Sequence, residues 1–405
     1  MPWKGSVLSQ RLAFVDAAVQ PGANISALCS QFDISRDTGH RLLKLFLADG
    51  PDALLPRSKK PLSSPARSTP QTEQLILALR DQHPAWGPRK LRRRLADLGH
   101  SLLPALSTFA AILKRHNRID PAASVARQPW LRFEREAPNQ LLQMDFKGWF
   151  KLADGSPCHP LTLVDDHSRF STGLFACPNQ TTGTVRNKLS QAFRAHGIPD
   201  AMLMDNGSCW GARMGSYTLL TVWLMQLGIR IYHGAPYHPQ TQGKNERFNR
   251  TLKAEVLNQP APLDCAAMQA RLDLWRNVYN CQRPHHALNL DTPASRYKNS
   301  AKPFPEKLLP PDYGHNAIVR KVQADGTFCF NKRVFVLGQA FPGQPIMLKP
   351  AKRDGAWDVC FAAFPIARLD PEDFQGKRLD PIRPKRYLAL AGETDSDRSS
   401  AARQG

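Results

Sequence analysis

The chain has 405 residues, of which 42% are hydrophobic and 22% charged, and this composition indicates a globular protein of two to four domains. No apolar run approaches the roughly 18 residues of a membrane span, and the first residues lack the apolar core of a signal peptide. We therefore expect a cytoplasmic protein with no membrane partner. The 55 Lys and Arg residues outnumber the 34 Asp and Glu residues, which gives a net charge of +21. This charge favours nucleic acid as the partner. The alternative explanations of the charge are solubility, a ribosomal role or binding to a membrane surface.

Cysteine spacing argues against a zinc or redox motif. The eight cysteines are scattered singly, with none of the short C-x-x-C pairs that such sites use. We expect them to be small buried hydrophobes in a reducing cytoplasm. They are Cys29, Cys158, Cys177, Cys209, Cys265, Cys281, Cys329 and Cys360.

Residues 1–55 are predicted to form a helix-turn-helix DNA-binding domain. Three short helices fit the sequence, with Ser35 as the N-cap of the third and Gly50 at its end. A helix, a tight turn and a second helix with a basic polar side is the layout of this motif, although many three-helix bundles share it. The residues expected to contact DNA are Arg36, Arg41 and Lys44.

A second helical unit, helix-turn-helix or winged-helix-like, is predicted over residues 70–120, between linkers at residues 56–69 and 121–138. Pro70 and Pro88 suit the first positions of two of its helices. The basic run after Pro88 is dense enough to contact phosphates, with a solvated helix face as the alternative. The contacts expected from this run are Arg89, Lys90 and Arg93.

Residues 139–300 are predicted to form an α/β core with a mixed five-stranded sheet. In the first strand Leu142, Met144 and Phe146 face one way, while Gln143 and Asp145 face the other. Strand and helix patterns then follow in the order β-β-β-α-β-α-β-α-α. This order indicates antiparallel strands first and then parallel strands with crossover helices.

Three acidic residues of this core occupy positions suited to chemistry. Asp145 lies in the first strand and Asp205 at the carboxyl end of the fourth, and these strands are neighbours in the predicted sheet, so the carboxylates can converge. Glu246 lies in the helix after the fifth strand. Because clustered carboxylates are unstable unless protonated or bound to hard cations, the pattern predicts a Mg²⁺ site. Two such ions would suit phosphodiester displacement.

The helix that contains Glu246 is predicted to have two faces. With about 100° between successive residues, Phe248, Leu252 and Val256 form an apolar stripe that packs on the sheet. The opposite face is polar and borders a groove where a carboxylate and cations can meet phosphates. It holds Glu246, Asn249, Arg250 and Lys253.

A further acidic pair, Asp165 and Asp166, lies at a strand end in the sequence VDDHSR. We interpret both as turn and capping residues. Arg169 is the expected partner of this pair.

The C-terminal part is predicted to contain a small all-β barrel. Five short strand patterns separated by Gly and Asp turns fill residues 314–370. Residues 371–405 offer little to bury and are expected to be a disordered tail.

Four segments of the chain resemble those of a known superfamily. The segments QMDF, MDNGS and APYHPQTQGKNERFNRTLK are similar to the three catalytic blocks of the DDE transposases and retroviral integrases. The segment YNCQRPHHALNLDTPASRY resembles the sequence that follows this core in bacterial insertion-sequence transposases. The third block and this last segment are highly specific together, and the resemblance is firm over residues 139–297.

The resemblance implies a fold, a reaction and a set of site residues. It implies an RNase H-like core that uses Mg²⁺, or Mn²⁺ as a substitute, as two ions held by Asp145, Asp205 and Glu246. It also implies a homo-oligomer on paired ends of double-stranded DNA in the bacterial cytoplasm, associated with the nucleoid. The enzyme would hydrolyse a phosphodiester at a terminal inverted repeat to free a 3′ hydroxyl and then join it to target DNA. Residues lining the site or contacting DNA would be Asn206, Tyr237, Gln242, Lys244, Arg250 and Lys253.

The sequence differs from the family pattern in two respects. The interval from Asp205 to Glu246 is 246 − 205 = 41 residues, longer than in the usual integrase pattern. The chain also lacks the His/Cys zinc module of retroviral integrases, so the helix-turn-helix units must recognise the DNA ends. The alternatives to a transposase are a catalytically silent DNA-binding protein derived from one and a structure-selective nuclease with the same core.

Overall fold

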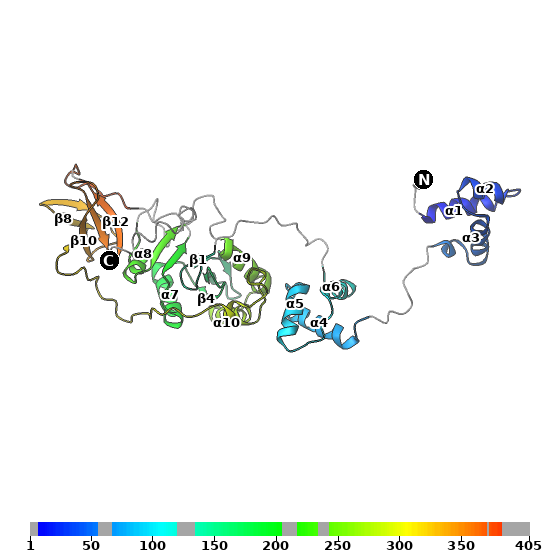
Figure 1. Ribbon diagram of the computed structural model, residues 1–405, viewed down its shortest axis with the longest axis horizontal. Helices are drawn as coiled ribbons and strands as arrows, with labels where there is room; N and C mark the ends of the chain where they lie inside the picture. The colour runs from blue at the N-terminus through cyan, green and yellow to red at the C-terminus, as the bar shows by residue number, and fades with distance from the viewer. Residues whose placement is uncertain are drawn as a thin grey trace. The chain divides into compact units, whose positions relative to one another are not determined.

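The computed structural model describes residues 7–55, 67–119, 134–204, 217–233, 243–370 and 372–382 (Figure 1). The chain forms two compact units, divided between Ser68 and Thr69, and each is described by itself. Among the described residues, no helix is both long enough and apolar enough to cross a membrane.

The first unit is a bundle of three helices closed by a short 3-10 turn. Its third helix begins after Ser35, whose hydroxyl accepts a hydrogen bond from the backbone N–H of Thr38 at 3.2 Å, and ends at Gly50 with a φ of +74°, as predicted. Phe14, Cys29 and other apolar side chains fill its centre. The elements are α1 (Val7–Ala18), α2 (Ile25–Gln31), α3 (Arg36–Asp49) and η1 (Pro51–Leu54).

The second unit begins with another group of three helices. Pro70 and Pro88 open the first two of these helices, as predicted. Trp86 and Phe109 are fully buried among them. The elements are α4 (Pro70–Gln82), α5 (Pro88–Asp97) and α6 (Leu106–Arg115).

A mixed β-sheet forms the centre of the second unit. Its main strands lie in the order β4-β3-β1-β5-β6, and the short β2 pairs with the start of β3. The pairs β1–β3 and β3–β4 are antiparallel, whereas β1–β5 and β5–β6 are parallel, which confirms the predicted mixed sheet. The strands are β1 (Leu142–Phe146), β2 (Phe150–Lys151), β3 (Pro157–Asp165), β4 (Ser171–Cys177), β5 (Ala201–Met204) and β6 (Arg230–His233).

Helices cover both faces of this sheet. On one face, Leu142 and Met144 pack with apolar residues of α7 (Thr182–His196) and α8 (Leu219–Gln226). On the other, Val164 and Leu174 pack with α9 (Gly243–Leu252) and α10 (Cys265–Cys281). One π-helical turn, η5 (Lys253–Leu257), continues α9. The sheet therefore separates two cores, and β1 contributes an apolar face to one and a polar face to the other.

The C-terminal region contains two small sheets. A four-stranded sheet has the order β12-β11-β10-β7, and β8 and β9 form a separate hairpin, so the pairing of the described strands does not close into the predicted barrel. There are also six strands where five were predicted, because β11 and β12 are joined through Ala362, at a φ of +49°, with no Gly or Pro to signal the turn. The strands are β7 (Ile318–Lys321), β8 (Thr327–Phe330), β9 (Arg333–Val336), β10 (Pro345–Pro350), β11 (Trp357–Phe361) and β12 (Phe364–Leu369).

Residues 372–382 pack onto this region, so the predicted disordered tail is wrong for them; residues 383–405 lie outside the described part. Leu379 is 2% exposed, and the backbone N–H of Val336 donates to the carbonyl of Lys377 at 3.0 Å. The Tyr217 hydroxyl donates to the carbonyl of Ile382 at 2.8 Å. This segment therefore joins the C-terminal strands to the residues that precede α8.

Replacing Leu379 tests this packing. Leu379→Ala should lower the free energy of unfolding by about 2–5 kcal/mol, because truncating a buried leucine leaves a cavity. Phe374→Ala is the control: this side chain is 69% exposed, and its loss should change stability by no more than about 0.5 kcal/mol. Urea unfolding would measure both, and equal effects would contradict the docking of the segment.

Thiol exposure differs among the cysteines. Cys29, Cys158, Cys177 and Cys360 are buried, as predicted, whereas Cys265 is partly exposed and Cys281 and Cys329 are exposed, so the prediction of general burial is wrong for these last two. Cys209 lies outside the described residues. Burial raises the pKa of Cys158 to about 12 and that of Cys177 to about 11.

Alkylation of the native protein near pH 8, read by mass spectrometry, would test this division. Cys281 and Cys329 should be modified rapidly, because they are exposed. Cys158 and Cys177 should be modified only after unfolding, because the thiolate is the reacting species and burial suppresses it. Rapid modification of Cys158 in folded protein would contradict the packing of β3.

Candidate active site

Asp145 lies on the polar face of β1, as predicted, beneath helix α9. Its carboxylate Oδ2 accepts a hydrogen bond from the Asn249 amide of α9 at 2.8 Å. Its backbone carbonyl accepts a hydrogen bond from the Thr162 hydroxyl of β3 at 3.0 Å. The carboxylate is therefore held in one orientation by a side chain from another element.

Helix α9 is fixed over β1 and β3 by both polar and apolar contacts. The backbone N–H of Asn245 donates to Gln143 at 3.2 Å, and the Thr162 hydroxyl donates to the Asn245 side chain at 3.0 Å. The predicted apolar stripe is confirmed: Phe248, Leu252 and Val256 are at most 2% exposed. The apolar stripe packs against the sheet, while the asparagines of α9 form hydrogen bonds with polar side chains of the strands.

Asn249 contacts Asp145, and the sequence analysis did not predict this contact because it placed Asn249 on an open polar face of the helix. It is only 5% exposed, and it faces Asp145 instead of solvent. Its position three residues after Glu246, one turn along the same helix, was the available signal.

Glu246 lies in the first turn of α9 and is exposed. Asp205, Asn206, Tyr237 and Gln242 lie outside the described residues. Strand β5 ends at Met204, immediately before Asp205, and pairs in parallel with β1 through Leu142↔Met202 and Gln143↔Leu203. Among the described residues, no three His, Cys, Asp or Glu side chains gather closely enough to hold a metal ion, so the three-carboxylate site stays a prediction.

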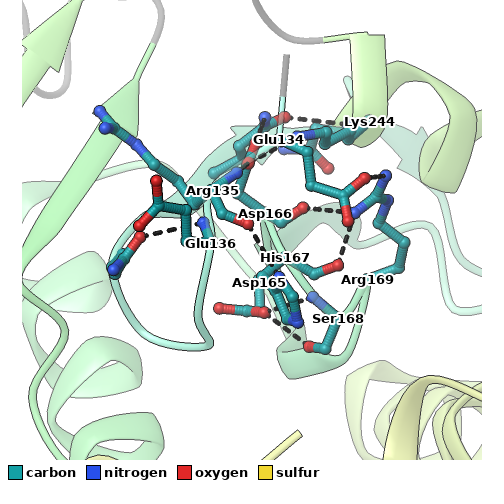
Figure 2. Close-up of polar contacts among 12 residues, drawn as sticks. Glu134, Arg135, Glu136, Asp165, Asp166, His167, Ser168, Arg169 and Lys244 are labelled. Carbon is teal, nitrogen blue, oxygen red and sulfur yellow. Dashed lines mark hydrogen bonds and ion pairs between the residues drawn. The ribbon is translucent and has the colours of Figure 1, made fainter. Parts of the chain in front are cut away.

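At the end of β3, Asp165 is a buried turn residue, as predicted (Figure 2). Its carboxylate accepts hydrogen bonds from the backbone N–H and hydroxyl of Ser168, at 2.7 and 2.6 Å, and from the backbone N–H of Asn139 at 2.8 Å. Burial raises the pKa of Asp165, and these hydrogen bonds oppose the rise. The carboxylate thus holds the β3–β4 turn against the start of the core.

Asp166 does more than the predicted capping of a turn. It is 1% exposed, and its carboxylate accepts hydrogen bonds from the Gln143 side chain and the Arg135 backbone N–H, both at 2.8 Å. Its Oδ2 atom also lies 2.5 Å from the ammonium nitrogen of Lys244 (Figure 2). The predicted partner, Arg169, reaches only the backbone carbonyl of Asp166, and its ion pair is with Glu134 at 2.6 Å.

Lys244 was predicted to contact DNA, and the structure gives it a different partner. Its side chain is 16% exposed, and its ammonium group is paired with Asp166 inside the core. Burial lowers the pKa of Lys244, and the adjacent Asp166 carboxylate opposes that shift. The error arose because a basic residue in a basic helix gives no sign of which way it points.

The other predicted DNA contacts fall into two groups. One group is exposed and remains available to DNA: Arg36, Arg41, Lys44, Arg89, Arg250 and Lys253. Lys90, by contrast, is 8% exposed, since it lies on the buried side of α5 beside Leu91. Arg93 is half-buried and paired with Asp97 at 2.8 Å and Asp291 at 3.3 Å. Consecutive residues of the basic run point in different directions around α5, so they cannot all face DNA. The predicted DNA contact is therefore wrong for Lys90.

Family models match successive parts of the chain. The N-terminal matches are a Helix-turn-helix domain at residues 10–61 and a Homeodomain-like domain at residues 38–113. Two models described as Integrase core domain match residues 135–239 and 227–293. The IS481 family transposase, C-terminal domain matches residues 317–377.

Curated relatives include proteins of bacterial insertion elements. The insertion element IS476 uncharacterized 39.2 kDa protein of Xanthomonas euvesicatoria is 28% identical over 250 residues, which cover 58% of this chain and 70% of that protein. The insertion element IS407 uncharacterized 31.7 kDa protein of Burkholderia multivorans is 29% identical over 158 residues; the match covers 39% of this chain and about half, 55%, of that protein. Among solved structures, the chain matches the HTLV-2 integrase catalytic core domain in complex with magnesium. The match covers 40% of this chain and 97% of that one, with 15% sequence identity and a TM-score of 0.30.

By these matches the chain is similar to insertion-sequence transposases of the integrase superfamily, with helix-turn-helix domains before an integrase core. Within that class, residues 317–377 are similar to the C-terminal domain of IS481 family transposases. The resemblance seen in the sequence motifs is thereby confirmed.

Asn249→Ala tests the contact that holds Asp145. Removing the amide should lower the free energy of unfolding by about 1–3 kcal/mol, because a partly buried carboxylate loses a hydrogen-bond donor. Asn187→Ala is the control, since that asparagine is exposed on α7, and it should cost no more than about 0.5 kcal/mol. Denaturant unfolding at neutral pH would compare them, and equal stabilities would remove Asn249 from the site.

Proposed function

We propose that this protein is an active DNA transposase that binds the terminal inverted repeats of an insertion sequence. It hydrolyses a phosphodiester at each end to free a 3′ hydroxyl and then joins that hydroxyl to target DNA by transesterification. The observation that best supports this proposal is the side-chain contact between Asp145 of β1 and Asn249 of α9, one helical turn from Glu246. The end of β5 immediately before Asp205, on the strand beside β1, further supports it.

The groups around Asp145 fit a hard divalent cation. Asp145 supplies carboxylate oxygen, the ligand type that Mg²⁺ prefers. The Oδ1 atom of Asn249 is buried with no hydrogen-bond partner among the described residues, so this acceptor calls for a group that those residues do not supply. We propose that Asp145, Asp205 and Glu246 hold two Mg²⁺ ions, or Mn²⁺ as a substitute. Bound there, the ions would activate the attacking oxygen and stabilise the leaving one.

The remaining residues of the chain would bind and place the DNA. Arg250 and Lys253 are exposed on and just after α9, where they would bind phosphates of the terminal DNA next to the carboxylates. Arg36, Arg41 and Lys44 are exposed on α3 of the first unit, the helix that would enter the major groove. Since two DNA ends must be held side by side while each is joined to target DNA, we propose a homo-oligomer assembled on the paired ends.

Glu246→Gln provides the central test. The substrates are end-labelled duplexes from the DNA that immediately flanks the gene, and the readouts are Mg²⁺-dependent nicking and strand joining. The variant should lose at least about a hundredfold in nicking, since it removes a metal ligand, and should keep its affinity for the duplex. Glu306→Gln is the matched control, because that carboxylate is 68% exposed and pairs with Arg194.

The products separate the remaining functions. Nicking with joined products that Glu246→Gln abolishes supports the transposase. Nicking without joining indicates a nuclease. Specific binding with no nicking in Mg²⁺ or Mn²⁺ by folded protein overturns the proposal in favour of a regulatory DNA-binding protein.

A further inference from the structure

A closed polar network ties the first turn of α9 to the polar face of β1. The ammonium group of Lys244 pairs with Asp166, whose other carboxylate oxygen accepts a hydrogen bond from the Gln143 side chain at 2.8 Å. The carbonyl oxygen of Gln143 in turn accepts a hydrogen bond from the backbone N–H of Asn245, the residue next to Lys244. We call these four residues the Lys244 anchor.

The anchor is buried, so its geometry is strongly specified. Asp166, Gln143 and Asn245 are at most 2% exposed, and the side chain of Lys244 is 16% exposed. Separating Lys244 from Asp166 would leave a charge in the core without its partner, which is costly. The pairing therefore admits one placement of the start of α9 relative to the end of β3.

The position of Lys244 is unfavourable for the helix alone. It lies in the first turn of α9, where the helix dipole disfavours cations and the N–H groups lack partners within the helix. A first turn of this kind depends on contacts with the rest of the fold for its order. Glu246 lies in the same turn and is exposed, and its neighbours Lys244 and Asn245 make contacts that tie this turn to Asp166 and Gln143.

We propose that Lys244 is a positioning residue, whose ion pair with Asp166 fixes the first turn of α9 and so holds Glu246 in place to bind the divalent cations. This inference rests on the proposed function, because it assigns a task to Lys244 within the same site. Lys244 itself contacts neither the DNA nor the cations. Its effect passes through Asn245 and the backbone to the carboxylate.

The test compares full-length Lys244→Met and Asp166→Asn with the wild type by two measurements. The first is a MgCl₂ titration of nicking on the flanking duplex; the concentration for half-maximal rate should rise at least about tenfold in both variants. The second is amide hydrogen exchange of residues 243–247 without DNA or metal, which should become at least about tenfold faster as the turn opens locally. Lys244→Arg, which keeps the charge, should restore most of both properties.

Two controls distinguish positioning from general stability. Lys302→Met makes the same change in an exposed ion pair with Asp200 and should leave both readouts at wild-type values. Leu189→Ala removes a fully buried side chain of α7 and should speed exchange across the core without a specific change in the first turn of α9. Because the anchor is one unit, the double variant Lys244→Met/Asp166→Asn should show no more exchange at residues 243–247 than either single variant.

The outcomes decide the inference separately from the proposed function. A wild-type Mg²⁺ requirement and wild-type exchange at residues 243–247 in Lys244→Met would overturn it. Uniformly faster exchange, as expected for Leu189→Ala, would also overturn it by reducing Lys244 to a structural role. If the wild type fails to nick DNA, the proposed function fails, and unchanged local exchange would then reject the anchor as well.

Discussion

The central constraint on the α/β core is that β1 places two polar side chains beneath a helix. Gln143 and Asp145 lie between strands β3 and β5, on the face that α9 covers, so their polar atoms need partners from the protein. Asn245 and Asn249 of α9 supply those partners at a spacing of one helical turn. If α9 slid along the sheet, it would break both contacts and bury unpaired polar groups. The apolar stripe gives α9 its affinity for the sheet, and the asparagines give it a register.

The buried and the exposed cations of the core differ in their partners. Buried or nearly buried cations pair with carboxylates, as in Lys244–Asp166, Arg169–Glu134 and Arg283–Glu255. Such pairs offset the cost of desolvation within the protein. The cations that remain exposed on the same helix can then act on a polyanion from outside. One basic helix can thus serve both the fold and a DNA substrate because its residues point in different directions.

Local patterns in the sequence predicted the parts of the fold that depend on local physics. The alternation in β1, the apolar stripe of α9 and the start of α5 at Pro88 follow from strand period, helix period and the geometry of proline. The sequence could not predict that Lys90 and Lys244 point inward, because charge alone does not define a direction. The partner of Lys244 is Asp166, which is distant in sequence and was interpreted as a turn residue. Such pairs, and the β11–β12 turn without Gly or Pro, depend on tertiary structure.

The packing of the C-terminal region links it to the α/β core. Tyr217, which directly precedes the cap of α8, donates a hydrogen bond to Ile382 and packs edge-on against Phe341 with a ring separation of 5.3 Å. The apolar side chains of both regions form one continuous buried cluster. Moving one region away from the other would expose this cluster to water, at a cost that grows with the apolar area. The C-terminal strands and the α/β core therefore share one hydrophobic core, whereas the first helical bundle has a core of its own.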